Sequence, residues 1–375
     1  MKILIGADIV PTATNQHFFE QEEMEKIVDG DLYEVLNKAD YRVFNLEVPL
    51  TDTEAPIEKC GPNLIASAES AAGLKQLGID FLTLANNHIL DQGTQGLRST
   101  TEQLDRAGIA YAGVGNTPAE AARPHIAEIE GKKVGIYCCA EHEFSIVSDK
   151  QAGANPFNPL ETPDHIAALK ERCDYVICLY HGGKEHYRYP SPNLQKVCRK
   201  LVEKGADLVV CQHSHCIGCE EKWQNGTIVY GQGNFLFDHS KSEYWQTSVL
   251  VQVDLQALTV EYIPIQKNGN AVKLAKGEDA QEIISAMQAR TKQIEQKEFV
   301  ESSYEEFAVM KLYGYFYTVG GFWRGLLFKV INRVFRKRPK ITHWYGKKKL
   351  IEMINCIDCE AHRELLLKGL ETASK

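Results

Sequence analysis

The sequence lacks a long uninterrupted apolar run, since no stretch reaches the roughly 18 apolar residues that a membrane-spanning helix needs. The N-terminal segment already turns polar at Asp8, too early for the apolar region of a signal peptide. An excess of positive charge is also missing, because the formal net charge is −8. A negative net charge argues against general nucleic-acid binding. We therefore expect a cytoplasmic protein with no nucleic-acid partner.

The sequence also lacks internal repeats and low-complexity tracts, and its cysteines are not even in number. The count of 11 cysteines is odd, which favours reduced thiols over a disulfide framework. Most of them lie in apolar, strand-like runs, where cysteine behaves as a small hydrophobic residue. Structural zinc sites are the alternative in two places, namely Cys211 with Cys216 and Cys219, and Cys356 with Cys359 and His362. Neither place offers four ligands in an evident closed geometry, so buried thiols are preferred.

The order of the expected elements indicates an α/β fold. Over residues 1–265, short β-rich runs alternate with amphipathic helical stretches. The last expected strands follow one another without helices, so part of the sheet system should be antiparallel. Turn-forming residues at 266–277 predict a domain boundary, with a helical, basic and aromatic C-terminal region over residues 266–375.

Residues 307–351 contain no acidic residue, although they carry eleven lysines and arginines and many aromatic residues. Three interpretations remain open for this segment. It is a packed helical appendage, an amphipathic element at an anionic membrane surface, or a binding surface for a polyanionic polymer. The second interpretation would place the protein at the inner membrane surface.

Polar residues follow six separate β-rich runs at the point where each run ends. These residues are Asp8, Asn45 with Glu47, Asn86 to His88, His181, His213 with His215, and Asn234. The carboxyl ends of strands in α/β sheets meet in one crevice, so we expect these side chains to converge. Residues two apart in an extended segment point the same way, which lets His213 and His215 face the same crevice.

The residue types in this set suit divalent metal ions. A pair of ions needs a bridging carboxylate, further oxygen ligands, imidazoles and open positions for water and substrate. Such ions polarise a phosphoryl oxygen and lower the pKa of water. His88 is then placed to donate a proton to a leaving group, and Asp91 to orient His88.

Several motifs give residues 1–265 a family resemblance. They are Gly6-Ala7-Asp8, Asn45-Leu46-Glu47, Ala85-Asn86-Asn87-His88-Ile89-Leu90-Asp91-Gln92-Gly93, His181-Gly182-Gly183-Lys184-Glu185, His213-Ser214-His215 and Tyr230-Gly231-Gln232-Gly233-Asn234-Phe235. The Asn-Asn-His-x-x-Asp-x-Gly block and the two-histidine segment are specific in combination. With them the chain resembles the CapA family of capsule (poly-γ-glutamate) biosynthesis proteins, which is itself similar to the calcineurin-like metallophosphoesterases.

The resemblance implies a four-layer α/β/β/α sandwich and one or two divalent ions, either Mn, Fe or Zn. By resemblance, Asp8 and His215 hold one ion, Glu47 bridges, and the other ion is held by Asn87, His181 and His213. The implied function is hydrolysis of a phosphoester or related linkage in capsule or cell-envelope polymer synthesis, on an anionic or phosphorylated polymer or small molecule. A non-catalytic assembly component with a degenerate metal site is the alternative.

Two departures from the superfamily's pattern concern the Asp8 half of the site. Phosphoesterases of this type usually begin with Asp-x-His, whereas Asp8 is followed by Ile9 and Val10. Glu47 stands where an Asp is commoner. One metal position thus lacks an imidazole, and we expect one firmly held ion and one labile ion.

Overall fold

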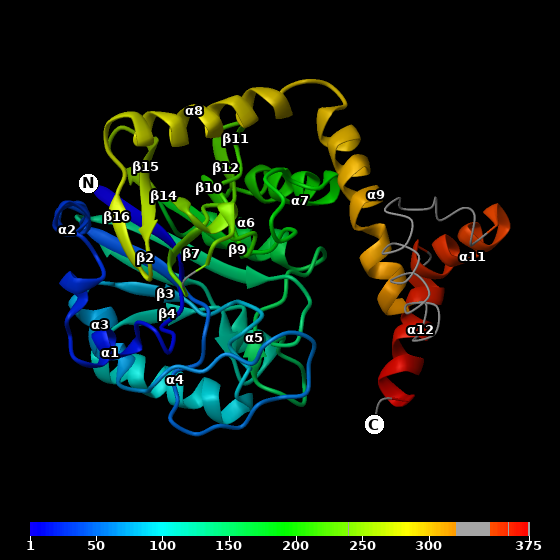
Figure 1. Ribbon diagram of the computed structural model, residues 1–375, viewed down its shortest axis with the longest axis horizontal. Coiled ribbons are helices and arrows are strands. Elements are labelled where there is room, and N and C mark those ends of the chain that lie inside the picture. Colours follow the sequence, from blue (N-terminus) through cyan, green and yellow to red (C-terminus); the bar gives the residue numbers. More distant parts are fainter. Residues whose placement is uncertain (239, 320–345, 359, 374–375) are drawn as a thin grey trace. The chain divides into compact units, whose positions relative to one another are not determined.

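The computed structural model describes residues 1–238, 240–319, 346–358 and 360–373 (Figure 1). The chain divides into two compact units, Met1–Glu301 and Ser302–Lys375. The first unit contains two large β-sheets and all the predicted site residues, so it is the unit that positions the site.

The first sheet combines a parallel half with an antiparallel half. Its strands are, in spatial order, β16 (Ala271–Leu274), β15 (Thr259–Asn268), β14 (Thr247–Asp254), β1 (Lys2–Ile9), β2 (Tyr41–Leu46), β3 (Phe81–Thr83) and β4 (Ala110–Ala112), with β13 (Asn234–Leu236) paired to β1. Strands β1 to β4 run parallel to one another. Strands β14, β15 and β16 are antiparallel, as expected from the absence of helices between them.

The second sheet has a parallel centre and an antiparallel strand at each edge. Its strands are, in order, β11 (Glu220–Trp223), β12 (Gly226–Tyr230), β10 (Leu208–Gln212), β9 (Tyr175–His181), β7 (Lys132–Ala140) and β6 (His125–Ile129). A third, two-stranded sheet pairs β5 (Val114–Gly115) with β8 (Gly153–Ala154).

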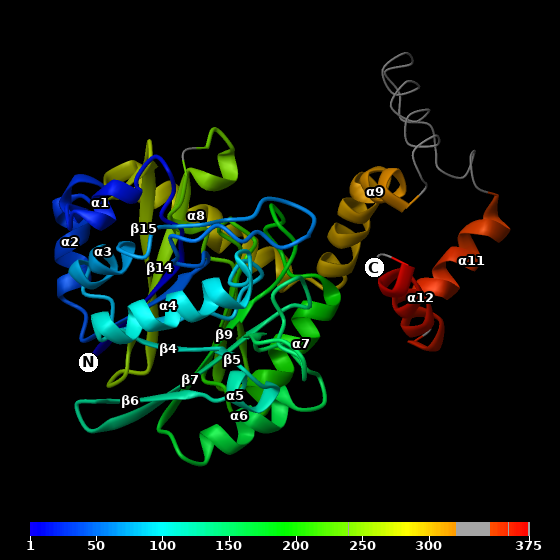
Figure 2. The same ribbon diagram turned by 90° about the horizontal axis from the view of Figure 1, so that it is seen from below.

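Three hydrophobic cores show how the layers stack. Alternate residues of β1 face opposite ways, so Ile3 and Ile5 join the core between the two sheets while Leu4 joins the core under the first group of helices. That group covers the outer face of the first sheet and comprises α1 (Gln16–Glu20), α2 (Gly30–Asn37), α3 (Ser70–Gln76) and α4 (Gly93–Ala107). The outer face of the second sheet is covered by α6 (Thr162–Lys170) and α7 (Pro192–Glu203) (Figure 2). The predicted four-layer α/β/β/α sandwich is confirmed.

The compact unit extends beyond the boundary at residue 265 that the sequence predicted. The turn-forming residues there close a β-hairpin, because Asn268 pairs with Ala271 and only two residues, the first a glycine with φ of +66°, lie between them. Helix α8 (Gly277–Ile294) then packs on β11 and β15 (Figure 1). Its buried Ile283 and Met287 contribute about 1.5–3 kcal/mol each to stability. The boundary of the first unit therefore moves to Glu301.

The second unit is helical over its described part. Helix α9 (Phe299–Val319) leads into it, and α11 (Lys347–Asp358) contacts α12 (Glu360–Ala373). Much of the basic, aromatic segment over residues 307–351 lies outside the described residues, since 320–345 are among the residues left out. Within the described helices, none combines the length and the apolar character that crossing a membrane requires.

Candidate metal centre

The predicted ligands lie at the carboxyl ends of neighbouring parallel strands from both sheets. Asp8 is near the end of β1 and Glu47 directly follows β2, while His181 ends β9 and His213 follows β10. The pairing register of β1 shifts between Ile5 and Asp8. Asp8 therefore lies opposite Asn45 of β2 and Asn234 of β13. The structure thus brings together groups that lie far apart in the sequence, as the strand-end pattern predicted.

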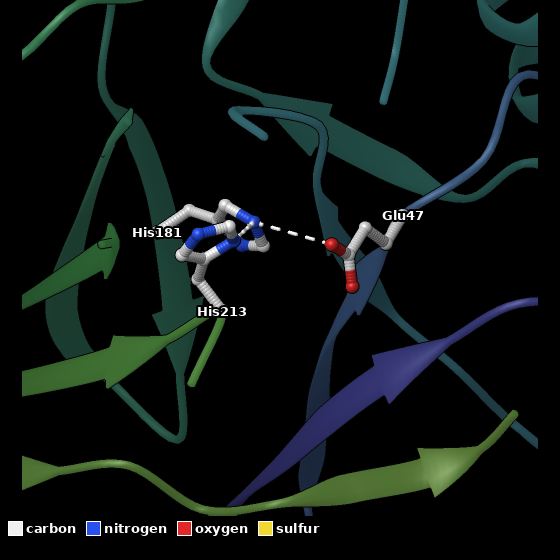
Figure 3. A group of neighbouring side chains, drawn as sticks. All are labelled: Glu47, His181 and His213. Carbon is white, nitrogen blue, oxygen red and sulfur yellow. Dashed lines mark hydrogen bonds and ion pairs between the residues drawn. The ribbon is translucent and has the colours of Figure 1, made fainter. Parts of the chain in front are cut away.

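One group of potential ligand atoms is formed by Glu47, His181, His213 and Asn87 (Figure 3 shows the first three). His181 Nε2 lies 3.3 Å from Glu47 Oε1, 3.1 Å from His213 Nδ1 and 3.0 Å from Asn87 Oδ1. Ligand atoms around one ion are separated by roughly 3.0–3.4 Å when metal–ligand distances are about 2.1 Å. The three distances from His181 Nε2 therefore match the spacing of ligand atoms around a single divalent ion.

A second group shares Glu47 and adds Asp8 and His215. His215 Nδ1 lies 3.5 Å from Asp8 Oδ2 and 2.8 Å from Asn234 Oδ1. The Asn45 amide donates to Asp8 Oδ1 at 2.8 Å and thereby leaves Oδ2 for the cluster. Glu47 is the one residue common to both groups, which is the position of a bridging carboxylate.

Three of the four carboxylate oxygens of Asp8 and Glu47 are buried without a hydrogen bond in the described part of the chain. Within the described residues, both oxygens of Glu47 and Oδ2 of Asp8 have no hydrogen-bond partner, although both side chains are fully buried. A buried charge of this kind is costly unless a counter-charge or a metal ion compensates it. The donor set and its unpartnered oxygens therefore fit a divalent cation.

The backbone at the two-histidine segment is strained. His213 and His215 both adopt positive φ, at +84° and +52°, a region that non-glycine residues rarely occupy. Such conformations cost on the order of 1–3 kcal/mol each and are concentrated at functional sites. The strain turns both imidazoles into the crevice, where His215 contacts Asp8 and His213 contacts His181.

The electrostatics differ between the two groups. Burial raises the pKa of Glu47, but His181 and His215 more than offset this effect and hold the pKa below its usual range. Burial lowers the pKa of His213, so its imidazole is neutral and can act as a ligand. Burial also opposes protonation of His215, yet Glu47 and Asp8 raise its pKa to about 9. A metal ion would have to displace a proton from His215 but not from His213.

His88 and Asp91 lie beside the cluster and contact each other. His88 Nδ1 is 2.6 Å from Asp91 Oδ2, and the carboxylate of Asp91 also accepts from the N–H of Leu64 at 2.6 Å. This contact orients the imidazole and leaves Nε2 as the nitrogen that can release a proton. The predicted pairing of these two residues is present in the structure.

Two residues around the site, Lys59 and Glu143, were not predicted. The side chain of Lys59, only 2% exposed, forms an ion pair with Asp91, and its Nζ lies 3.2 Å from His88 Nδ1. Glu143 accepts from the amide of Asn87 at 2.9 Å, which turns the Asn87 oxygen toward His181. Asn45, one of the polar residues expected at the strand ends, orients Asp8. Lys59 and Glu143 lie in irregular loops, where no periodic pattern marks them.

The cysteines are separate from this cluster. The two groups of three or more potential ligands found among the described residues contain no cysteine. Cys216 and Cys219 are buried, and Cys211 lies 3.6 Å from Cys198, sulfur to sulfur, under α7. Cys356 is exposed on α11, and Cys359 lies outside the described residues.

Comparison with known proteins assigns the chain to a family. Residues 2–239 match the model of the family described as bacterial capsule synthesis protein PGA_cap. The matched segment covers more than half of the chain, and the chain belongs to this family.

Curated relatives agree with the assignment. The chain is 29% identical over 230 residues to the capsule biosynthesis protein CapA of Bacillus anthracis, a match that covers 59% of this chain and 56% of that protein. It is 27% identical over 237 residues to the PGA biosynthesis protein CapA of Bacillus subtilis (strain 168), covering 59% of each. The chain thus spans less than two thirds of the length of these relatives. A solved 5′-nucleotidase from Candida albicans gives a TM-score of 0.43 at 13% identity, covering 82% of this chain and 57% of that one, a likeness that says nothing about chemistry.

Proposed function

We propose that the chain is a metal-dependent hydrolase of phosphoesters, or of a related linkage, that acts in the synthesis of a capsule or cell-envelope polymer. The observation that carries this proposal is the sharing of Glu47 between two groups of ligand atoms while both of its buried oxygens lack hydrogen bonds. Membership of the capsule synthesis family supports the biological setting. The substrate would be an anionic or phosphorylated polymer or a small molecule.

The residues divide the work between metal binding and proton transfer. Asn87, His181 and His213 would hold one ion, Asp8 and His215 the other, and Glu47 both. Bound Mn, Fe or Zn would polarise the phosphoryl oxygen and make a nucleophile available from water at neutral pH. The oxygen from water would form a new bond to phosphorus as the P–O bond to the leaving group breaks, and His88 Nε2 would give its proton to the departing oxygen. Asp91 keeps the imidazole in the required orientation through Nδ1.

A hydrolysis assay with a matched histidine control tests the proposal. Metal-free protein is supplemented with Mn²⁺ and offered a 4-nitrophenyl phosphomonoester and the corresponding diester. We expect metal-dependent release of nitrophenol that falls by roughly 10²–10⁴-fold in His88→Ala, the usual contribution of a general acid. Metal content should be unchanged in that variant. His17→Ala removes an exposed imidazole from α1 and should leave the rate unchanged.

Two results would contradict different parts of the proposal. Protein that binds no transition metal after supplementation would reject the metal site altogether. Protein that binds metal but hydrolyses neither ester would reject hydrolysis of phosphoesters and leave the metal site standing.

A non-catalytic assembly role is the second candidate, because the Asp8 half lacks the imidazole of an Asp-x-His motif. Val10 occupies that place and is only 1% exposed in the helix-side core. In this alternative, His88→Ala would leave capsule formation intact, whereas deletion of residues 307–375 would abolish it. The reverse pattern supports the hydrolase.

Peripheral membrane contact through residues 307–351 is a further part of the proposal. Among the described residues of this segment, Val309, Tyr315 and Ile351 are more than half exposed, at 67%, 55% and 55%. Exposed apolar side chains within a segment free of acidic residues suit an anionic lipid surface. Co-sedimentation with phosphatidylserine-containing liposomes should be lost when residues 307–375 are removed. Equal sedimentation of both proteins would reject membrane contact through this segment.

A further inference from the structure

Two arginines bind backbone carbonyl groups of the same loop. Arg188 Nη1 donates to the carbonyl of Ile217 at 3.2 Å, and Arg290 Nε, from α8, donates to the carbonyl of Gly218 at 2.8 Å. These two carbonyls belong to consecutive residues, and the two guanidinium groups are near enough for the charge of Arg188 to act on Arg290. Arg290 lies outside the segment that matches the family model, residues 2–239.

The two charges are not compensated by a carboxylate. Across the part of the chain that the structure describes, neither Arg188 nor Arg290 forms a salt bridge. The carboxylates of the adjoining strand β11 are engaged elsewhere, Glu220 with Lys222 at 3.3 Å and Glu221 with Arg199. Burial, followed by the proximity of Arg188, lowers the pKa of Arg290. Two half-buried like charges destabilise each other unless an anion joins them.

Both guanidinium groups keep most of their donors available. A guanidinium carries five N–H groups in a planar fork that matches a carboxylate or a phosphate. Each of these two makes one hydrogen bond to a carbonyl oxygen, and Arg188 also lies 4.8 Å above the ring of Tyr244. The carbonyl bonds and the ring fix the orientation of the forks in advance, which reduces the entropy lost on binding.

A short series of ring contacts connects this pair with the metal centre. The ring of Tyr244 stacks on His186 at 4.9 Å and 13°, and the ring of His186 lies 6.5 Å from that of His215. Trp245 donates to His186 Nε2 at 3.1 Å and holds that ring in place. Arg188 is thus connected to His215 through the rings of Tyr244 and His186 and makes no direct contact with the ligand atoms in the described part of the chain.

We propose that Arg188 and Arg290 form a subsite for an anionic group of the substrate, a carboxylate or a phosphate, other than the group bound at the metal centre. The substrate would then carry at least two anionic groups. That the bound anion belongs to a substrate rests on the proposed function. Anion binding itself requires neither a bound metal nor turnover.

Calorimetric titration of the metal-free full chain tests the subsite. Citrate probes for carboxylate recognition and inorganic triphosphate for phosphate recognition. We expect at least one probe to bind, with affinity reduced roughly tenfold or more in Arg290→Gln, since charge-assisted hydrogen bonds contribute about 1.5–3 kcal/mol. Arg290→Lys keeps the positive charge and should restore part of the affinity. Arg98→Gln removes an exposed arginine of α4 that forms no salt bridge in the described part of the chain and should leave the affinity unchanged.

The alternative is that both arginines only brace the loop at residues 217–218. A bracing role predicts a lower melting temperature for Arg290→Gln with unchanged probe affinity, and that result would overturn the subsite. Failure of both probes to bind wild-type protein would overturn it as well. Arginine-dependent binding in a protein that hydrolyses no ester would retain the subsite and reject the proposed hydrolysis.

Discussion

The two halves of the proposed metal centre are built from the same kinds of side chain but differ in number and charge. The Glu47 half has the imidazoles of His181 and His213 and the amide oxygen of Asn87. The ligand atoms of Glu47, His213 and Asn87 lie within 3.3 Å of His181 Nε2. The other half has Asp8, His215 and the shared carboxylate of Glu47. Its His215 Nδ1 lies 3.5 Å from Asp8 Oδ2. His215 is also held protonated by its acidic neighbours, which raise its pKa to about 9.

The Glu47 half could therefore take an ion directly, whereas the Asp8 half would first have to lose a proton. The difference between the halves arises at Val10. Its apolar side chain is buried in the core at the position where an Asp-x-His motif would supply an imidazole to a metal ion. We therefore expect the Glu47 half to fill first and the Asp8 half to hold its ion weakly. Four experiments test this contrast.

The largest effect is expected from Glu47→Gln, because Glu47 belongs to both halves. The variant should lose both ions and lose activity by more than roughly 100-fold, the upper range for residues that only support a ligand. In wild-type protein, Mn²⁺ at 100 times its Kd should add about 2.7 kcal/mol to the free energy of unfolding, and Glu47→Gln should lose this gain. Glu54→Gln, an exposed control, should keep it. A retained metal-dependent gain in Glu47→Gln would disprove the bridging role.

Removing one imidazole from each half should separate the two positions. His213→Ala should abolish the tightly held ion, whereas His215→Ala should retain it and lose only the weaker one. Elemental analysis after dialysis against limiting and excess Mn²⁺ measures both. Identical losses in the two variants would mean that the halves are equivalent.

The proton on His215 predicts a pH dependence for only one position. Affinity of the Asp8 half should rise by roughly tenfold per pH unit below pH 9, since binding releases one proton. His213, whose pKa burial lowers, adds no such dependence at neutral pH to the Glu47 half. In metal-free protein, protonated His215 stabilises the fold below its ordinary pKa of 6.5, and this contribution is lost as the pH rises through about 9. Parallel pH profiles for both ions would contradict the assignment.

The smallest effect is expected from Lys59, which lies outside both halves. Lys59→Met removes the buried partner of Asp91 and a neighbour of His88, so turnover should fall by roughly tenfold through misorientation of the imidazole. The fold should lose about 3–5 kcal/mol, as when a buried ion pair loses one partner. Lys59→Arg keeps the charge and should recover part of both. Metal content that falls in Lys59→Met would show that Lys59 supports the metal centre as well.

Much of the site was predictable because strand ends determine it. Asp8, Glu47, His181 and His213 each follow an apolar β-run, and parallel strands bring such positions to one edge of a sheet. Lys59 was not predictable, because it lies in the irregular segment between β2 and α3 and reaches Asp91 only through tertiary folding. The compact unit extends past residue 265 to Glu301, which the sequence could not indicate because Gly269 is as typical of a hairpin turn as of a linker.

The most direct measurement is anomalous X-ray scattering from crystals of the full chain, grown at limiting and at excess Mn²⁺. At limiting Mn²⁺ we predict one peak, bound by Glu47, Asn87, His181 and His213. At excess Mn²⁺ and pH 9 a second peak should appear at Asp8 and His215, with Glu47 between the two ions. A first peak at Asp8 and His215, or no peak at either concentration, would contradict the account.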